Sequence, residues 1–344
     1  MDHSGKRVNQ ADIAEAAGVS TATVSRALNG TGIVTPEARK RIDAAIAELG
    51  YMPHGAARAL ASRRSHTVGA VIPTLASAIF AAGIDAFERH LNEAGLTMLL
   101  ALSNYDLDIE TLKVRRLLER GVDAIALVGN AHSPEVHELI TRAGVPYVHT
   151  WAWSPDAVHP HVGFSNFEAA RQVAHHLADL GHSNIGMIAG IAKDNDRATQ
   201  RVAGTRQGLI DRGLVLQDNQ IIEAAYTHAA ARQALRTLIK DGQGRPTAIV
   251  CGNDVLATGA LIEAQAHEID VPGELSLTGF DDLPLAAHLN PPLTTIVVPA
   301  EKMGQTAATA LIAALELGEP ARGQQLEARL VIRQTTAPPP PKHN

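Results

Sequence analysis

Apolar residues in the first fifty positions recur at helical spacing in three short stretches. A residue that favours a helix N-cap precedes each stretch, at Asn9, Ser20 and Thr35, and Gly18 and Gly50 end the first and the third. The apolar positions on the inner faces are Ile13, Ala14, Ala17, Val24, Leu28, Ile42, Ala45, Ile46 and Leu49. Helices of this length cannot bury a core alone, so the pattern predicts a three-helix unit.

The first two predicted helices are joined by a tight turn in which Val19 fills the corner. Asp12 completes a capping box with Asn9, and Pro36 takes a first helical position, where its missing N–H costs nothing. Two helices joined in this way can lay the second one in the major groove of DNA. A helical hairpin from a larger α-domain is the alternative interpretation.

The order of the residues in this unit carries a resemblance. The stretches A-D-I-A-E-A-A-G-V-S-T-A-T-V-S-R-A-L-N-G, V-T-P-E-A-R-K-R-I and E-L-G-Y-M-P-H resemble the DNA-binding headpiece of the lactose-repressor/galactose-repressor family of bacterial transcriptional regulators. The resemblance implies that Thr21, Ala22 and Arg26 contact base edges. It places Thr23, Ser25 and Asn29 nearer the phosphates. Because Thr21 and Ala22 are small, methyl contacts should matter there.

Residues 55–62, G-A-A-R-A-L-A-S, offer about two helical turns, which is marginal for a helix in water. In the family resembled, this stretch is a hinge helix that orders on DNA. The resemblance therefore implies that Leu60 wedges into the minor groove at the centre of the operator. Without the headpiece before it, the same stretch would be interpreted as a flexible linker with one exposed leucine.

From Thr67 onward, short apolar runs alternate with amphipathic helices, and the pattern restarts after residues 163–165. Such alternation predicts parallel sheets with right-handed crossovers, here in two doubly wound units. The predicted strands are 67–73, 97–102, 123–128, 146–151, 184–190, 220–224, 247–251, 275–280 and 326–332. The predicted helices are 77–94, 109–120, 134–143, 167–180, 200–212, 229–240, 255–267 and 303–317.

We therefore expect an all-α helix-turn-helix headpiece followed by a bilobed α/β body of the periplasmic-binding-protein type. The expected parts are the headpiece (1–53), a hinge helix and linker (54–66), the body (67–336) and a disordered tail (337–344). Within the body, lobe 1 should comprise about 67–164 plus 300–325, and lobe 2 about 165–297 plus 326–336. The tail holds no leucine heptad that would predict a tetramerising coiled coil.

Charge is divided unevenly between these parts. Residues 1–66 hold nine Lys and Arg against six Asp and Glu, whereas the rest holds 21 against 30. A basic headpiece suits phosphate binding, and an acidic body would be repelled by DNA. The lone Cys251 excludes an internal disulfide, and neither a membrane-length apolar run nor an apolar N-terminal leader is present. We expect a cytoplasmic, nucleoid-associated protein.

Open α/β sheets bind ligands beyond the carboxyl ends of their strands. No glycine-rich phosphate motif follows a predicted strand, which argues against a dinucleotide or P-loop enzyme. The family resemblance extends over the body and places Arg201, Asn253 and Asp281 at effector-binding positions, in R-V-A-G-T-R-Q-G-L, C-G-N-D and G-F-D-D-L-P-L. An arginine, an amide and a carboxylate suit a polyhydroxy ligand. Asp281 could equally cap the helix that follows, and Arg201 could be a surface arginine.

Aromatic residues make up 3% of the chain, so their positions are informative. Phe80, Phe164 and Tyr226 match positions that line the pocket of the family resembled. Trp151 lies at the end of a predicted strand, where many relatives carry aspartate, and its indole would stack on a sugar ring or another planar ligand. Core packing is the alternative for Phe80 and Phe164.

Several histidines raise the question of a metal site. His149, His159 and His161 lie close in sequence, as do His175 and His176, but no cysteine or carboxylate cluster accompanies them, so we expect surface or structural histidines. No Ser-His-Asp or paired-carboxylate arrangement is evident. We expect neither an enzyme nor a cofactor or metal.

These features together predict a ligand-responsive transcriptional regulator, a repressor that binds a palindromic DNA operator as a homodimer. A sugar, sugar acid or related metabolite in the interlobe cleft would control its DNA affinity. Two other classes of protein remain alternatives. They are a solute-binding protein, which shares the bilobed body, and an α/β sugar-processing enzyme with an accessory DNA-binding domain.

Overall fold

The computed structural model describes residues 8–29, 32–52, 64–240 and 244–341. Internal contacts divide the chain into two units, Met1–His66 and Thr67–Asn344, which we call the headpiece and the body. The predicted hinge residue Leu60 lies outside the described residues. Among the described helices, none is long and apolar enough to cross a membrane.

The headpiece consists of α1 (Gln10–Ala17), α2 (Thr21–Asn29) and α3 (Pro36–Leu49). The Asn9 side chain accepts hydrogen bonds from the backbone N–H groups of Ala11 (2.7 Å) and Asp12 (3.2 Å), and the Asp12 carboxylate accepts from the Asn9 N–H (2.8 Å). The predicted capping box is thus confirmed. Gly18 ends α1 and Gly50 ends α3, each with φ of 61°, a left-handed conformation that glycine adopts at no steric cost.

One apolar cluster holds the three helices together. Ile13, Val24 and Ile42 are fully buried in it, one from each helix, and Tyr51 closes it after α3. The Arg39 guanidinium donates a 2.6 Å hydrogen bond to the Ala27 carbonyl, joining α3 to the last turn of α2. The three-helix unit expected from the hydrophobic pattern is confirmed.

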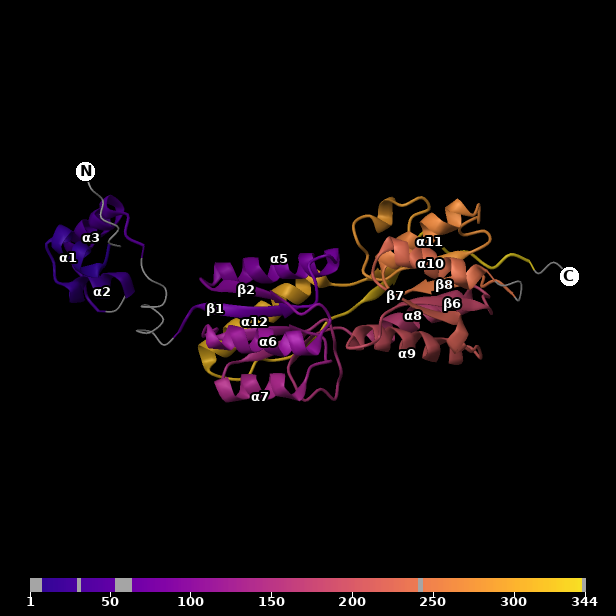
Figure 1. Ribbon diagram of the computed structural model, residues 1–344, viewed down its shortest axis with the longest axis horizontal. Helices are drawn as coiled ribbons and strands as arrows, with labels where there is room; N and C mark the ends of the chain where they lie inside the picture. The colour runs from indigo at the N-terminus through magenta and orange to yellow at the C-terminus, as the bar shows by residue number, and fades with distance from the viewer. Residues whose placement is uncertain (1–7, 30–31, 53–63, 241–243, 342–344) are drawn as a thin grey trace. The chain divides into compact units, whose positions relative to one another are not determined.

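The first half of the body is built on a six-stranded parallel sheet with the strand order β11-β5-β4-β3-β1-β2. Figure 1 labels two of its strands, β1 and β2. Its strands are β1 (Thr67–Ile72), β2 (Thr97–Leu102), β3 (Ala124–Val128), β4 (Tyr147–Thr150), β5 (His161–Gly163) and β11 (Gln324–Gln325). Apolar side chains from alternate strand positions pack on α5 (Ala78–Glu93) and α12 (Ala300–Leu317) at one face and on α6 (Leu107–Glu119) and α7 (Pro134–Ala143) at the other.

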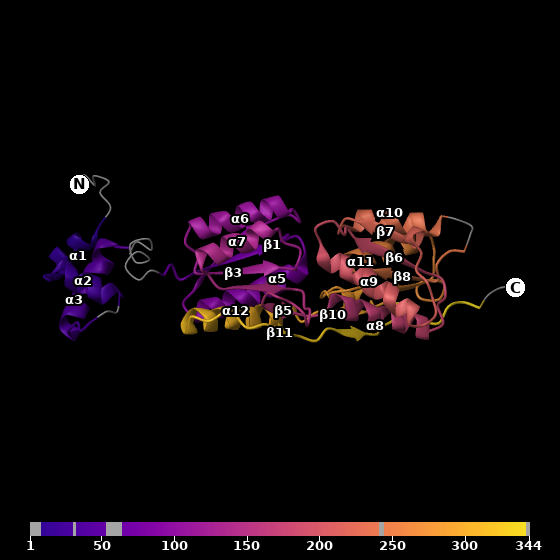
Figure 2. The same ribbon diagram turned by 90° about the horizontal axis from the view of Figure 1, so that it is seen from below.

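The second half is built on a four-stranded parallel sheet with the order β7-β6-β8-β9 (Figure 2). Its strands are β6 (Ile185–Gly190), β7 (Ile221–Ala224), β8 (Ala248–Cys251) and β9 (Ser276–Thr278). One face packs on α8 (Asn166–Asp179) and α9 (Asp196–Ile210), and the other on α10 (His228–Ile239) and α11 (Asp254–Ala266). The predicted class of fold, a helical headpiece with a two-sheet α/β body, is confirmed.

The chain crosses between the two halves three times. It passes from β5 into α8, returns through β10 (Thr295–Val297) to α12, and leaves again through β11 and β12 (Arg329–Val331). β10 and β12 pair antiparallel as a separate two-stranded sheet. Beyond β12, Thr335 exchanges hydrogen bonds with Leu277 of β9. These crossings connect the two halves, and by their internal contacts the two halves form a single unit, the body.

The prediction differs from the structure at several elements. Of the strand expected at 326–332 only β12 (Arg329–Val331) forms, and β11 (Gln324–Gln325), which precedes that range, belongs to a different sheet. β5 was not predicted, because three buried residues carry too little pattern to be recognised. α9 begins four residues before the predicted 200, because the Asn195 side chain caps it by accepting from the Ala198 N–H at 3.4 Å.

Candidate functional site

One face of α2 is free of the headpiece core. Val24 and Ala27 are buried against the other helices, which leaves Thr21, Ala22 and Arg26 exposed on the opposite side. This exposed face carries the residues for which base-edge contacts were predicted. A short helix with two small residues and one arginine on its outer face can approach a base edge closely and place one bidentate donor there.

The residues predicted to lie nearer the phosphates are less exposed. Thr23 is half-buried, and its hydroxyl lies 2.9 Å from that of Ser20, whose oxygen also accepts from the Thr23 N–H at 3.2 Å. Ser25 is half-buried as well. The Asn29 side chain and the whole of Leu60 lie outside what the structure describes.

The body holds a cavity of about 520 Å³ at the carboxyl ends of its strands. Its lining comes from both halves of the body, from the segments that follow β1, β2, β6, β7 and β8. The lining residues are Thr74, Ala76, Ser77, Asn104, Tyr105, Asp106, Ile191, Lys193, Asp194, Asn195, Ala225, Tyr226, Asn253 and Val255. A volume of this order accommodates a small metabolite.

Two phenol rings of this lining lie close together, one from each half of the body. The ring centroids of Tyr105 and Tyr226 lie 6.2 Å apart. Burial, and next the neighbouring Tyr226, raises the pKa of Tyr105 to about 12, so its hydroxyl keeps its proton. The Asn195 amide donates to the Tyr226 hydroxyl oxygen at 3.2 Å, which leaves the Tyr226 proton free to be donated elsewhere.

A buried arginine connects the elements behind this lining. Arg201 of α9 donates from Nε to the Asn166 Oδ1 at 2.9 Å and from Nη1 to the Gly252 carbonyl at 2.6 Å. Its guanidinium carbon lies 3.7 Å from the centroid of the Phe280 ring, and Nη2 lies 3.9 Å from Asp281. Arg201 is therefore a buried, multiply bonded side chain and not the surface arginine of the alternative interpretation.

Two carboxyl groups lie buried in the same half of the body. Burial raises the pKa of Asp281 to about 6, although Arg201 opposes the shift. Burial, and next the neighbouring Asp281, raises the pKa of Asp254 to about 8. The Asp254 carboxyl also accepts from the Thr295 hydroxyl at 2.6 Å and from the Leu283 N–H at 2.7 Å. At neutral pH Asp254 therefore holds a proton.

Three predicted aromatic contacts are buried in the apolar core. Phe80 and Trp151 pack edge to face with centroids 5.3 Å apart, and the Phe164 ring lies 6.1 Å from that of Phe280. Trp151 has φ of 60°, and a side chain at Gly83 would collide with its indole. The indole N–H is buried without a hydrogen-bond partner among the described residues.

The predicted effector residues thus divide into two groups. Tyr226 and Asn253 line the cavity, and Asn253 also caps α11 by accepting from the Leu256 N–H at 2.9 Å. The other five lie among the buried side chains of the body, and in the described part of the chain the lining does not include them. These five are Phe80, Trp151, Phe164, Arg201 and Asp281.

Sequence reasoning did not single out several residues of the lining, notably Tyr105, Lys193 and Asn195. A usable signal was present, because each stands within a few residues of the carboxyl end of a predicted strand. Open α/β sheets bind ligands at that edge. Reading every polar residue just after a strand as a candidate would have found all three.

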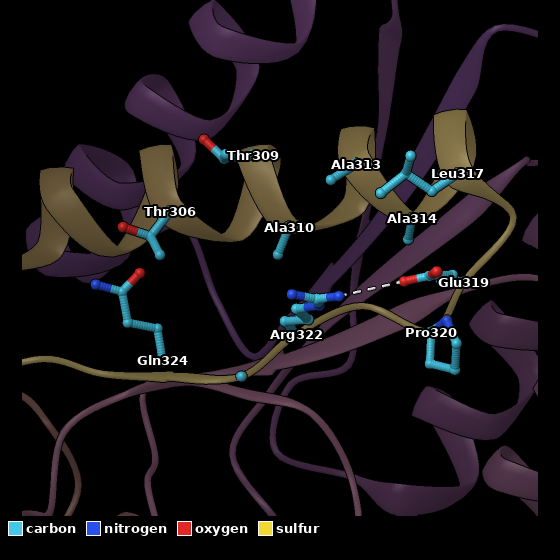
Figure 3. A pocket seen from close by; sticks show the side chains of 11 residues that line it. Thr306, Thr309, Ala310, Ala313, Ala314, Leu317, Glu319, Pro320, Arg322 and Gln324 are labelled. Atoms are coloured by element: carbon cyan, nitrogen blue, oxygen red, sulfur yellow. Dashed lines mark hydrogen bonds and ion pairs between the residues drawn. The ribbon is translucent and has the colours of Figure 1, made fainter.

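A second hollow, of about 220 Å³, lies against α12 and the segment that follows it (Figure 3). Small side chains such as Ala310 and Ala313 form much of its lining, with Leu317 at one end. Its visible ion pair, Arg322 with Glu319 at 3.3 Å, is exposed. Such a lining offers few fixed polar groups for a specific ligand.

The histidines raised the question of a metal site in the sequence. Within the described residues, no group of three or more His, Cys, Asp or Glu side chains is arranged to hold a metal ion. His175 contacts Asp211 at 2.9 Å and His176 contacts Thr336 at 3.1 Å, so the two adjacent histidines serve different surfaces. Cys251 is buried, and burial raises the pKa of its thiol.

A capped helix-turn-helix unit attached to a two-sheet α/β body with a cavity at the strand ends defines a class of protein, the DNA-binding regulators with a periplasmic-binding-protein-like body. Residues 10–54 match the family described as bacterial regulatory proteins, lacI family. Residues 174–336 match the periplasmic binding protein-like domain.

Individual relatives agree over nearly the whole chain. Catabolite control protein A of Priestia megaterium is 32% identical over 297 residues, 86% of this chain and 89% of that protein. The HTH-type transcriptional repressor PurR of Aliivibrio fischeri is 31% identical over 304 residues, 88% of this chain and 90% of that protein. The chain belongs to the lacI family of bacterial regulatory proteins, whose members are transcriptional regulators and not enzymes.

Solved structures show the same fold. The lac repressor dimer bound to operator and the anti-inducer ONPF superposes with a TM-score of 0.87 at 27% identity, covering 96% of this chain and 100% of that one. A LacI-family transcriptional regulator from Silicibacter pomeroyi also superposes with a TM-score of 0.87 at 27% identity, covering 95% and 99%. The family membership and the fold agree in making this chain a DNA-binding regulator.

Proposed function

We propose that this protein is a repressor that binds a palindromic operator as a homodimer, with a DNA affinity controlled by a small sugar-like effector in the body cavity. The observation that carries the proposal is the exposed face of α2, presented by a headpiece whose caps and core are complete. Two such faces related by two-fold symmetry would read the two halves of a palindrome.

On DNA, we propose that Thr21, Ala22 and Arg26 contact base edges. The hydroxyls of Thr23 and Ser25, with Asn29, would lie nearer the phosphates, where they set the register of the helix. Leu60 keeps its predicted place in the minor groove at the operator centre. A protein with these contacts acts where the chromosome lies, so the cytoplasmic, nucleoid-associated location belongs to the same proposal.

The chemistry of the cavity supports a polyhydroxy effector, a sugar, sugar acid or related metabolite. The lining supplies two phenol rings for the apolar faces of a ring, with amides and carboxylates for hydroxyl groups. Lys193 adds a cation, which would pair with an acidic group on the ligand. The transcriptional regulator CelR, whose structure is known in complex with cellobiose, is 29% identical to this chain.

We propose that the effector is bound by Tyr226 and Asn253 at the cavity lining and by Arg201 and Asp281 from behind it, with Phe80, Trp151 and Phe164 as the apolar core beneath. The unpaired indole N–H of Trp151 offers a donor to a hydroxyl that reaches it. Because lining residues come from both halves of the body, the effector would favour one orientation of the halves over another. A differential affinity of this kind is what a change in DNA affinity requires.

The DNA part of the proposal is tested with an operator selected from a random library by the purified protein. With six to ten phosphates contacted per dimer, affinity should fall roughly 10³- to 10⁵-fold between 50 and 200 mM salt. Arg26→Ala should weaken operator binding by about 1–3 kcal/mol and leave random DNA nearly unaffected. Arg89→Ala, an exposed arginine of the body, is the control. A salt-independent affinity, or equal losses on both DNAs, contradicts the proposal.

The effector part is tested by a thermal-shift screen of sugars and sugar acids, followed by calorimetry. A ligand at 100 times its Kd should stabilise the protein by about 2.7 kcal/mol. Tyr226→Ala should weaken that ligand at least tenfold, whereas Thr306→Ala, at the second hollow, should leave its affinity unchanged. Unchanged affinity in Tyr226→Ala places the ligand elsewhere.

A further inference from the structure

Five histidines gather at one edge of the first sheet. We call His132, His137, His149, His159 and His161 the histidine cluster. They come from the loop after β3, from α7, from β4 and from the segment that leads into β5. His149 and His161 are buried, and they are paired across neighbouring strands. None of the functions proposed above uses these side chains.

Close nitrogen contacts connect the cluster into a chain. The Nε2 atoms of His137 and His149 lie 3.3 Å apart, and His149 Nδ1 lies 3.2 Å from His161 Nε2. His161 Nδ1 in turn lies 2.7 Å from the His159 carbonyl oxygen. The rings of His137 and His159 stack with centroids 4.0 Å apart and planes 8° apart.

The hydrogen-bond chain is complete with neutral imidazoles, and it has room for one added proton but not for two. A carbonyl oxygen accepts and cannot donate, so His161 Nδ1 must carry the proton that points at His159. His161 Nε2 then accepts from His149 Nδ1, and His149 Nε2 accepts from His137 Nε2. One added proton can be taken up if the chain reverses its direction. A second added proton leaves two N–H groups facing each other.

Burial also disfavours the charged form of each of these imidazoles. It is the largest cause that lowers the pKa of His137, to about 4, and of His149, His159 and His161. The neighbouring imidazoles lower these pKa values further, because each proton would repel the next. His137 and His149 thus stay neutral at pH 7, and the cluster is unstable once they are protonated.

His132 joins the cluster to the turn at residues 129–130. Its Nδ1 lies 2.8 Å from a Glu110 carboxylate oxygen and its Nε2 lies 2.9 Å from the Gly129 carbonyl oxygen. The Asn130 Oδ1 oxygen contacts His161 Nε2, which donates to it when an added proton reverses the chain. Both residues of the turn are therefore held from one side by imidazoles of the cluster.

The other side of the turn carries the first residues of α9. Arg197 donates from Nη1 to the Val128 carbonyl at 3.3 Å and to the Asp196 carboxylate at 3.0 Å. Gly129, with φ of 91°, leaves no room for a side chain, since a Cβ there would collide with Arg197 and Asp196. The N-terminus of α9, which belongs to the second half of the body, thus packs directly on the turn that the cluster supports.

We propose that the histidine cluster is a pH-sensitive switch on the contact between the two halves of the body. While His137 and His149 are neutral, the cluster holds the 129–130 turn against α9. In an opened cluster these two imidazoles regain their ordinary affinity for protons, so acidification below about pH 6.5 favours opening. The charged imidazoles then repel each other and release the turn, so that α9 loses its contact with the first half. The switch needs no ligand and no DNA, so it stands independently of the function proposed above.

The charged groups around the cluster favour this outcome. Asp196 raises the affinity of His161 for a proton, and a charged His161 would compete with Arg197 for that carboxylate. Glu110 is already engaged by His132 and is not bonded to the buried pair. The groups that face the cluster are Glu110 from α6, His137 from α7, Tyr147 and His149 from β4, His132 and His159 from the loops, His161 from β5, and Asp196 and Arg197 from α9.

Hydrogen exchange read by mass spectrometry tests the switch on the full chain, at pH 7.5 and 5.5. After correction for the intrinsic pH dependence of exchange, the 129–132 segment and the first turn of α9 should lose protection in acid. An opening linked to one proton changes tenfold per pH unit, so we expect at least a tenfold gain over the two units. Retained protection at pH 5.5 overturns the proposal.

Variants separate the cluster from general acid sensitivity. The double variant His137→Gln/His149→Gln keeps polar side chains that take no proton, so its α9 should stay protected at pH 5.5. His288→Gln, an exposed histidine, should behave as the unmodified protein does. An equal loss of protection in the double variant contradicts the switch.

A milder variant and a second measurement guard against misfolding of the double variant. His159→Phe keeps a ring stacked on His137 and removes one protonation site, so the acid transition should shift to lower pH. In the unmodified protein, NMR titration of the imidazole Cε1–H signals should show the cluster charging in the same pH range in which α9 loses protection. Charging without loss of protection overturns the proposal.

Discussion

The two halves of the body each bury titratable side chains, and they keep charge out of the interior in opposite ways. In the first half His137 and His149 of the histidine cluster are neutral because burial makes their imidazoles give up protons. In the second half Asp254 is neutral because burial makes it keep one. The comparison shows that burial has no fixed sign on a pKa. It favours the uncharged form, whichever form that is.

The two groups consequently respond to pH with opposite signs. An unfolded histidine takes up a proton below about pH 6.5, whereas the folded cluster resists it, so stability falls as the pH falls below 6.5. Unfolded Asp254 ionises near pH 4, whereas the folded residue does so near pH 8, so stability falls as the pH rises between these values. Asp281 adds to the second effect between about pH 4 and 6.

The largest expected effect on stability concerns Arg201, which lies next to the buried carboxyl group of Asp281 in the second half of the body. Arg201→Ala removes the cation near Asp281 together with the bonds to Asn166 and Gly252, and should cost about 3–5 kcal/mol of unfolding free energy. Urea unfolding at pH 7 measures the loss. Arg206→Ala on the same helix removes an exposed ion pair and should cost no more than about 1 kcal/mol. Equal losses would show that Arg201 has no special role.

The next largest effect is the loss of stability of the unmodified protein as the pH falls. Six histidines with lowered pKa values, four of them in the histidine cluster, outnumber two carboxyls with raised ones, so the free energy of unfolding should fall from pH 6.5 toward 5. The slope should reach or exceed about 1.4 kcal/mol per pH unit, the value for one proton. Urea titrations at half-unit intervals measure it. A flat profile in this range would remove the histidine side of the comparison.

The loss of stability as the pH rises above 7 reports on the ionisation of Asp254. Above pH 7 most unfolded histidines have lost their charge, so between pH 7 and 8 stability should decline by up to about 1.4 kcal/mol per pH unit while Asp254 is charged only in the unfolded state. Asp254→Asn should abolish this slope. The lost acceptor toward Thr295 or Leu283 shifts the overall level, so the slope is the quantity to compare. An unchanged slope in the variant assigns the loss of stability above pH 7 to other groups.

The smallest effect serves as a pH-neutral reference in the headpiece. Asn9→Ala removes the acceptor for two backbone N–H groups at the start of α1 and should cost about 1 kcal/mol. Because an amide does not titrate, the loss should be the same at pH 6 and pH 8. Thermal unfolding followed by circular dichroism at both pH values checks this. A pH-dependent loss would mean that removing the cap alters titratable neighbours.

The headpiece could be predicted from its sequence almost element by element. The capping box of Asn9 and Asp12, the glycine ends and the buried Ile13, Val24 and Ile42 are local signals, each acting within about one helical turn. The alternation of the body was equally legible, because buried parallel strands are continuous apolar runs. Strands of two or three residues, such as β5 and β11, escaped because they are too short to carry a period.

The ligand cavity and the titratable clusters depended on the tertiary structure. Whether Trp151 or Arg201 lies in the core or at the cavity is set by how two sheets and their helices pack. No periodicity within ten residues encodes it. The five histidines span thirty positions and meet because β4 and β5 pair in one register and α7 packs beside them. Local hydrogen bonds and hydrophobic periods let the sequence determine the elements. Burial and long-range pairing, which set pKa values and bring distant side chains into contact, were decided only when those elements packed together.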